Sequence, residues 1–233
     1  MFETTALIQR SNAYKKERRV PLRRGIVFDF DLTLVDSAGG ICANLNALAA
    51  EKKLRRLQLA EVRRTIGWAL ADAMRSFWGD GPIEEEWLPR YRSFFEERNY
   101  AGVVPFPETV PALRKLRLRG ARLGIATNRL TPLGIVRAAG LDTLCPIIVG
   151  IDGFSPKPDP AIVLEALRQM GLKADEGVYV GDTDIDMKTA VNAGVAGVGV
   201  TTGNHDATAL KESGASHVIE NLSELPELWE EIK

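Results

Sequence analysis

The stretch that decides the fold is residues 26–33, Ile26-Val27-Phe28-Asp29-Phe30-Asp31-Leu32-Thr33. Its first three residues are β-branched or aromatic, which is typical of a buried strand in a parallel sheet. Such a strand delivers Asp29 and Asp31 to its carboxyl end, where open α/β sheets bind ligands. Two carboxylates this close repel each other unless a cation or a shared proton compensates their charge. We therefore expect a divalent metal ion and a phosphate group at this end of the strand.

The composition is that of an ordinary globular protein. Of 233 residues, 45% are hydrophobic and 26% are charged, which suits one large domain or one domain with an insert. The net charge of −1 gives no electrostatic reason to expect nucleic acid or a membrane as a partner, and no apolar run approaches the roughly 18 residues that span a bilayer. The first residues lack the apolar region of a signal peptide, so we expect a cytoplasmic protein. Cys42 and Cys145 lie far apart and are expected to be free thiols.

Positive charge is concentrated in residues 1–24. This segment has seven lysines and arginines against two glutamates, a net charge of +5. We interpret it as a solvated basic extension, and an arm that binds an acidic partner is the alternative.

From Gly25 onward, strand-like runs alternate with helix-like runs, which predicts βαβ units and a parallel sheet. The alternation is interrupted over residues 37–104, where apolar residues recur at helical spacing, and it resumes with a strand at residues 103–107. Ordinary connections in such a sheet are far shorter than this interval. We therefore predict an α/β fold with a Rossmann-like three-layer parallel sheet and a small α-helical domain inserted after the first strand.

The polar residues that could carry chemistry all follow predicted strands. They are Asp29 and Asp31, Thr127 and Asn128, Lys157, and Asp182 and Asp186. Because the carboxyl ends of parallel strands lie along one edge of a sheet, residues distant in sequence can meet there. These residue types suit phosphoryl transfer: Mg²⁺ and a lysine neutralise the phosphate, one carboxylate attacks phosphorus, and a second carboxylate moves protons.

Four motifs resemble those of the haloacid-dehalogenase superfamily of phosphatases, in the same order. They are Asp29-Phe30-Asp31-Leu32-Thr33, Thr127-Asn128, Lys157-Pro158-Asp159-Pro160 and Gly181-Asp182-Thr183-Asp184-Ile185-Asp186. The likeness extends over about residues 25–225, and the long helical interval resembles the cap of the phosphoglycolate-phosphatase-like subgroup. The resemblance implies a HAD-like core of residues 25–36 and 105–233 and a helical cap of residues 37–104.

The resemblance also implies roles for the catalytic and metal-binding residues. Asp29 would be the nucleophile and a ligand of Mg²⁺. Asp31 would be the general acid and base, and its backbone carbonyl would bind the metal. Asp182 would be a further metal ligand.

The remaining motif residues would support the phosphate. Thr127, Asn128 and Lys157 would bind it, and Asp186 would orient a metal-bound water or Lys157. At one position the chain departs from the family, because Leu32 stands where a glycine is usual. A leucine at this turn predicts a backbone that avoids positive φ.

The second carboxylate, Asp31, favours phosphate-ester chemistry over dehalogenation, because an alcohol leaving group needs a proton and a halide does not. The leading hypothesis is a Mg²⁺-dependent phosphatase acting on a small phosphorylated metabolite such as phosphoglycolate. A phosphomutase similar to β-phosphoglucomutase and a non-catalytic sensor of phosphorylated metabolites are the alternatives. Arg63, Arg64 and Arg75 could face the substrate's carboxylate, although a solvated helix face is the more common place for such residues.

Overall fold

The computed structural model describes residues 22–232. Most of the basic segment, residues 1–21, lies outside the described residues, so its interpretation as a solvated extension stays a prediction. Within the described part, no helix is both long and apolar enough to cross a membrane.

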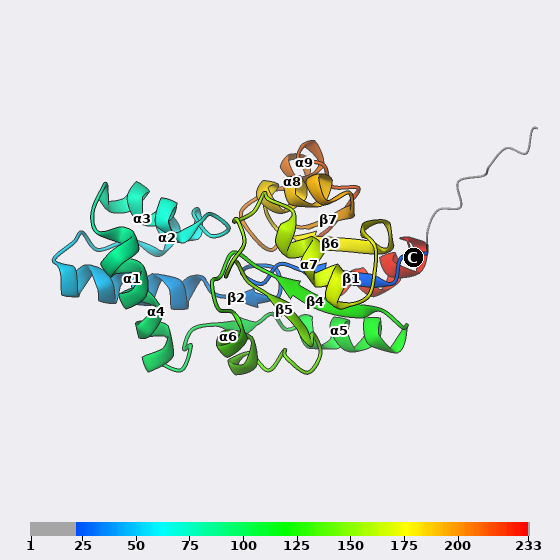
Figure 1. Ribbon diagram of the computed structural model, residues 1–233, viewed down its shortest axis with the longest axis horizontal. Helices are drawn as coiled ribbons and strands as arrows, with labels where there is room; N and C mark the ends of the chain where they lie inside the picture. Colours follow the sequence, from blue (N-terminus) through cyan, green and yellow to red (C-terminus); the bar gives the residue numbers. More distant parts are fainter. Residues whose placement is uncertain (1–21, 233) are drawn as a thin grey trace, which may run out of the picture.

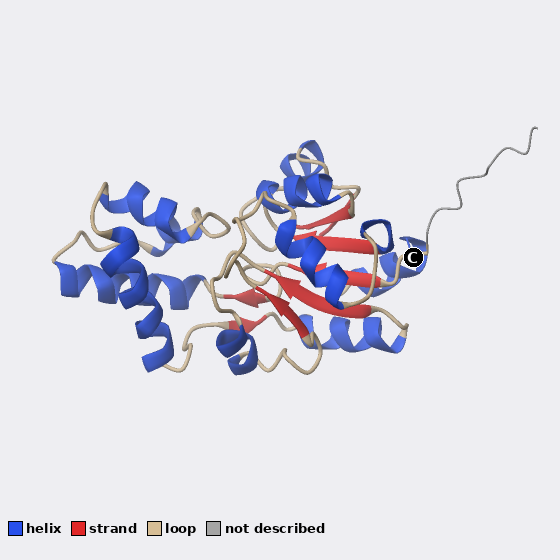
Figure 2. Ribbon diagram, in the orientation of Figure 1, coloured by secondary structure: helices blue, strands red, loops and turns tan. Residues whose placement is uncertain are grey.

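A six-stranded sheet forms the centre of the larger lobe (Figure 2). All of its strands are parallel, as predicted, and their order across the sheet is β5-β4-β1-β6-β7-β8. The strands are β1 (Gly25–Phe28), β4 (Arg122–Ala126), β5 (Ile147–Val149), β6 (Gly177–Gly181), β7 (Ala196–Val200) and β8 (His217–Ile219). Because β4 and β6 flank β1, the residues that follow these three strands come out side by side at one edge.

Side chains alternate between the two faces of each strand, and helices cover both faces. Ile26 and Phe28 of β1 pack in a core with α5 (Thr109–Leu118), α6 (Leu133–Ala138) and α10 (Leu225–Ile232). Val27 points the other way, into a core with α7 (Ala161–Gln169) and α8 (Asp184–Ala193). Helix α9 (Ala207–Glu212) and the 3₁₀ turn η2 (Ala174–Glu176) complete this lobe. The result is the predicted three-layer α/β fold.

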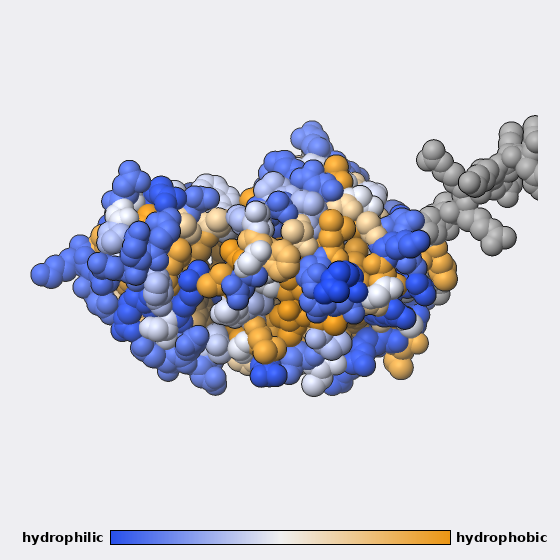
Figure 3. Space-filling view, in the orientation of Figure 1, coloured by the Kyte–Doolittle hydropathy of each residue, from blue (hydrophilic) through white to orange (hydrophobic). Residues whose placement is uncertain are grey.

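A second, helical lobe lies between β2 (Val35–Asp36) and β3 (Val104–Pro105), to the left in Figure 1. It consists of α1 (Ala38–Lys52), α2 (Leu59–Arg63), α3 (Leu70–Trp78), the π-helical turn η1 (Ile83–Trp87) and α4 (Leu88–Glu97). We call this lobe the cap. Its aromatic side chains pack on one another edge to face, as Trp78 does on Trp87 and Tyr91 on Phe95. The outer surface of the cap seen in Figure 3 is largely hydrophilic.

The structure has a strand within the predicted residues 103–107, but this strand does not belong to the main sheet as the sequence analysis implied. Residues Val104–Pro105 pair antiparallel with Val35–Asp36, apart from the main sheet. Val104 is exposed and Pro105 has no N–H to donate, which fits a short peripheral ribbon better than a central strand. We propose this ribbon as the junction between core and cap, in keeping with the predicted cap limits of residues 37 and 104.

Candidate active site

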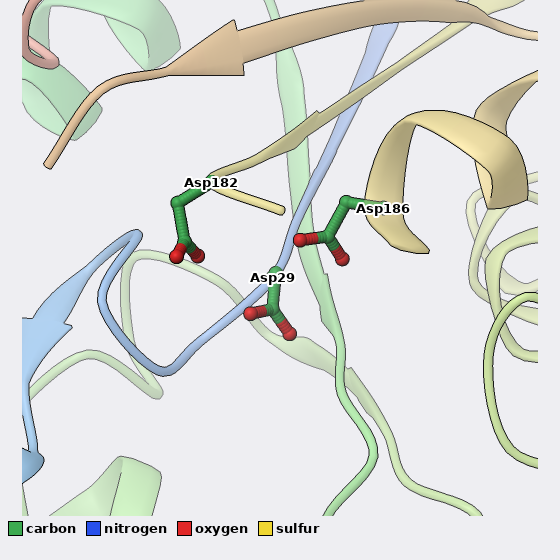
Figure 4. A group of neighbouring side chains, drawn as sticks. All are labelled: Asp29, Asp182 and Asp186. Atoms are coloured by element: carbon green, nitrogen blue, oxygen red, sulfur yellow. The ribbon is translucent and has the colours of Figure 1, made fainter. Parts of the chain in front are cut away.

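Three buried carboxylates lie close together at the carboxyl edge of the sheet (Figure 4). Asp29 directly follows β1, Asp182 directly follows β6, and Asp186 lies in the first turn of α8. One carboxylate oxygen from each lies within 4.8 Å of the others. Thr183 caps α8 by accepting a hydrogen bond from the backbone N–H of Asp186, which fixes the third carboxylate beside the second.

Lys157 inserts its ammonium group among these acids. It arrives from the loop between β5 and α7, and its Nζ donates to Oδ1 of Asp29 at 2.7 Å and to Oδ1 of Asp186 at 2.6 Å. Burial alone would lower the pKa of Lys157, but the two carboxylates raise it well above its usual value. The hydroxyl of Tyr179, in the middle of β6, lies 3.2 Å from the ammonium and 3.1 Å from Asp186. The lysine therefore remains charged and is held rigidly.

One lysine does not compensate all the negative charge. Burial raises the pKa of Asp29 to about 7, although Lys157 opposes the shift. Burial, with repulsion from Asp186 and Asp29, raises the pKa of Asp182 well above its usual range. Oδ1 of Asp182 accepts a hydrogen bond from Thr33 at 2.8 Å, whereas its Oδ2 is buried and has no hydrogen-bond partner among residues 22–232. A buried, unsatisfied carboxylate oxygen beside other acids fits a hard divalent cation bound there.

Asp31 takes a different position from the other acids. Both of its carboxylate oxygens accept hydrogen bonds from Arg129, at 2.8 Å from Nε and 2.7 Å from Nη2. Burial would raise the pKa of Asp31, but the guanidinium outweighs this effect and lowers it. The carboxylate is therefore ionised in this arrangement, and it lies outside the cluster of Asp29, Asp182 and Asp186.

Thr127 and Asn128 follow β4, next to Asp29, as predicted. Thr127 is buried and lines the same cavity as Asp29 and Lys157. The side chain of Asn128 accepts from the backbone N–H of Lys157 at 2.8 Å and donates to the carbonyl of Gly67 at 3.3 Å. Asn128 thus connects the core to the cap.

A cavity of about 220 Å³ lies between core and cap above these residues. Its floor is formed by Asp29, Asp31, Thr127 and Lys157. Cap residues form the opposite wall, which is mostly apolar and aromatic: Ile41, Leu45, Ile66, Trp68, Leu70, Tyr91 and Phe95. A small molecule bound there would lie between the core and the cap.

The prediction for Leu32 was wrong, because its φ is +59°, in the left-handed region that it was expected to avoid. Its side chain is fully buried in the main core, and its backbone N–H donates to the carbonyl of Val35. Its own carbonyl accepts from the hydroxyl of Thr202. Burial and these hydrogen bonds offset a backbone strain of about 1–2 kcal/mol.

The three arginines suggested for a substrate carboxylate do not line the cavity. Arg63 donates to the carbonyl of Thr202, and Arg75 pairs with Asp72 and Glu84 at the surface. Arg64 is exposed and is not among the residues around the cavity.

Among residues 22–232, the arginines that do line the cavity are Arg92 and Arg129, and sequence reasoning missed both. Arg129 follows directly on Thr127-Asn128, and that position was a usable signal. Tyr179 was missed as well, although a phenol in an otherwise aliphatic buried strand usually needs a hydrogen-bond partner.

Comparison with known proteins agrees with this geometry. The sequence profile of the haloacid dehalogenase-like hydrolases matches residues 26–200. The chain belongs to this family. It is 32% identical to a phosphoglycolate phosphatase of Rhodospirillum rubrum over 217 residues, which cover 87% of this chain and 89% of that protein. It is 33% identical to a phosphoglycolate phosphatase of Caulobacter vibrioides, with coverage of 86% and 88%.

Solved structures show the same fold. A crystal structure of a hydrolase from Pseudomonas syringae superimposes with a TM-score of 0.73 at 26% identity, covering 91% of this chain and 100% of the other. The chain is therefore an enzyme of the haloacid dehalogenase-like hydrolases, with an inserted helical cap. The buried acids and Lys157 occupy the positions where the family motifs were identified in the sequence.

Proposed function

We propose that the protein is a Mg²⁺-dependent phosphatase that hydrolyses a small phosphorylated metabolite through an aspartyl-phosphate. The observation that carries this proposal is the contact of Lys157 with Asp29 beside Oδ2 of Asp182, which is buried without a hydrogen-bond partner among the described residues. This contact brings an anionic nucleophile next to a positive charge, and a phosphate dianion needs such a charge to offset its repulsion from the nucleophile. The family membership and the phosphatases among the relatives support it.

The residues of the chain divide the reaction between them. The carboxylate of Asp29 attacks phosphorus, and the alcohol leaves with a proton from Asp31. Asp31 then removes a proton from water, which attacks the phosphorus of the aspartyl-phosphate and restores Asp29. The pairing with Arg129 suits the base step, because it keeps Asp31 ionised. The acid step requires that this pair loosens when substrate binds and that Asp31 takes up a proton from solvent, which it then gives to the alcohol; the proton removed from water in the base step restores this form.

Thr127 and Lys157 would hold the phosphate oxygens, and their position in the lining of the cavity with Asp29 supports this role. Asn128 contributes by fixing the backbone of Lys157, and Asp186 by fixing its ammonium. Asp29, Asp182 and the backbone carbonyl of Asp31 would hold Mg²⁺. The ion would neutralise charge on the phosphate during transfer.

Phosphoglycolate is the proposed substrate, which the names of two relatives support. The cavity has room only for a small molecule, and its cap wall would exclude water from the reaction. We also propose a cytoplasmic location, which the two free thiols support.

Substitution of the nucleophile tests the proposal. The wild-type protein is expected to release inorganic phosphate from phosphoglycolate with Mg²⁺ and to lose this activity in EDTA. Asp29→Asn is expected to abolish turnover, whereas Asp184→Asn, whose carboxylate pairs with Lys188 outside the cluster, serves as a matched control. Retained turnover by Asp29→Asn would remove the mechanism. Transfer of phosphate within a sugar phosphate would favour the phosphomutase, and tight binding without turnover would favour the sensor.

A further inference from the structure

In the part of the chain that the structure describes, three cationic side chains line the cavity, and two of them are already engaged. Lys157 contacts Asp29 and Asp186, and Arg129 forms a two-pronged pair with Asp31. The third, Arg92, lies on α4 of the cap, on the wall that faces the catalytic acids.

Arg92 has no hydrogen bond or ion pair with any residue from 22 to 232. Glu96, one turn further along α4, also borders the cavity, but it is exposed and forms no ion pair with Arg92. Arg92 is half-buried beside Tyr91, and this burial lowers the pKa of its guanidinium. The guanidinium of Arg92 has thus lost part of its hydration and gained no protein partner in exchange, so its N–H donors are free to bind a ligand.

The charges around the cavity indicate what that ligand is. The transferred phosphate is matched by Lys157 and the expected metal at the floor. Any further negative charge on the substrate lies toward the cap, where the surroundings are mainly apolar and aromatic. An uncompensated carboxylate there would lose its hydration without replacement. A guanidinium offers the fork of donors that suits a carboxylate.

We propose that Arg92 binds a carboxylate on the alcohol part of the substrate and so selects carboxylate-bearing phosphate esters. This inference rests on the proposed phosphatase function and adds to it the residue that determines specificity. It replaces Arg63, Arg64 and Arg75, whose side chains do not line the cavity. The small cavity is consistent with a short alcohol in which carboxylate and phosphate lie close together.

The test compares two substrates that differ only in the relevant group. Ethyl phosphate has a methyl group where phosphoglycolate has a carboxylate. The measured quantity is the ratio of the kcat/KM value for phosphoglycolate to that for ethyl phosphate. We expect a wild-type ratio well above one and a fall of roughly 10- to 100-fold in Arg92→Gln, since a charged hydrogen-bonding partner is lost. Arg92→Lys keeps the charge without the fork and is expected to fall between the two.

Arg75→Gln is the matched control, since Arg75 is a cap arginine engaged at the surface, and its ratio is expected to equal that of the wild type. Thermal unfolding of each variant verifies that the fold is intact. An unchanged ratio in Arg92→Gln, or a wild-type ratio of one or less, would overturn the inference while leaving the phosphatase in place. A wild-type protein that hydrolyses neither ester would instead refute the proposed function.

Discussion

Replacement of Lys157 by methionine measures what the buried cluster contributes to stability. The side chain of Lys157 is only 1% exposed, and its ammonium lies 2.7 Å from Asp29 and 2.6 Å from Asp186. Methionine has a similar length and fills the same space without a charge. The change therefore leaves two carboxylates buried without their cation.

The expected loss follows from the burial of all three groups. Removal of one member of a buried ion pair costs about 3–5 kcal/mol, because the remaining charge cannot regain its hydration. With a urea dependence of roughly 3 kcal/mol per M, the midpoint of unfolding should fall by about 1–1.7 M. Lys157→Met/Asp186→Asn removes one of the stranded charges and is expected to recover part of this loss.

The assay is urea unfolding of the metal-free protein in EDTA, followed by circular dichroism. Lys188→Met is the matched control, because Lys188 pairs with Asp184 at the same 2.6 Å but is 54% exposed. The free energy of unfolding should fall by less than about 0.5 kcal/mol in Lys188→Met, as for other exposed ion pairs one helical turn apart. A loss in Lys157→Met no larger than in Lys188→Met would refute the reasoning that burial makes this cluster strong.

Two further predictions concern single positions. A Cβ at Gly203 would collide with Oδ2 of Asp182, so Gly203→Ala should raise the Mg²⁺ concentration for half-maximal activity by roughly tenfold or more. Gly39→Ala is the control and should leave this concentration unchanged, because a Cβ there meets nothing within 4 Å. Equal Mg²⁺ titrations for the two variants would contradict the prediction. Burial raises the pKa of the Cys145 thiol to about 12, whereas Cys42 is only half-buried. Iodoacetamide at pH 8 should therefore alkylate Cys42 well before Cys145, as measured by mass spectrometry of the native protein. Similar alkylation rates for the two thiols would contradict the prediction and show that Cys145 is accessible.

The sequence was sufficient to predict that the sheet is parallel and that distant residues gather at its edge. This worked because parallel strands place their carboxyl ends together, whatever the length of chain between them. Lys157 is the clearest case, since it lies 128 residues from Asp29 and yet contacts it. The helical insertion was predicted from a different signal, the helical spacing of apolar residues over residues 37–104.

The features that the sequence did not predict depend on tertiary contacts. The backbone preference of Leu32 is overridden by burial of its side chain. The direction of an arginine on a helix depends on which acids lie nearby, so Arg75 turns to surface partners while Arg92 faces the cavity. The pairing of Asp31 with Arg129 joins two loops that are far apart in the sequence, and no local sequence pattern indicates that these loops lie close together.

A crystal structure of the protein with Mg²⁺ and beryllofluoride, a mimic of the phosphoryl group, tests the central claim most directly. We predict beryllium bound to a carboxylate oxygen of Asp29, fluorine atoms contacting Lys157 and Thr127, and Mg²⁺ in contact with Asp29 and Asp182. Beryllofluoride bound to any other side chain, or Mg²⁺ away from Asp182, would contradict the account.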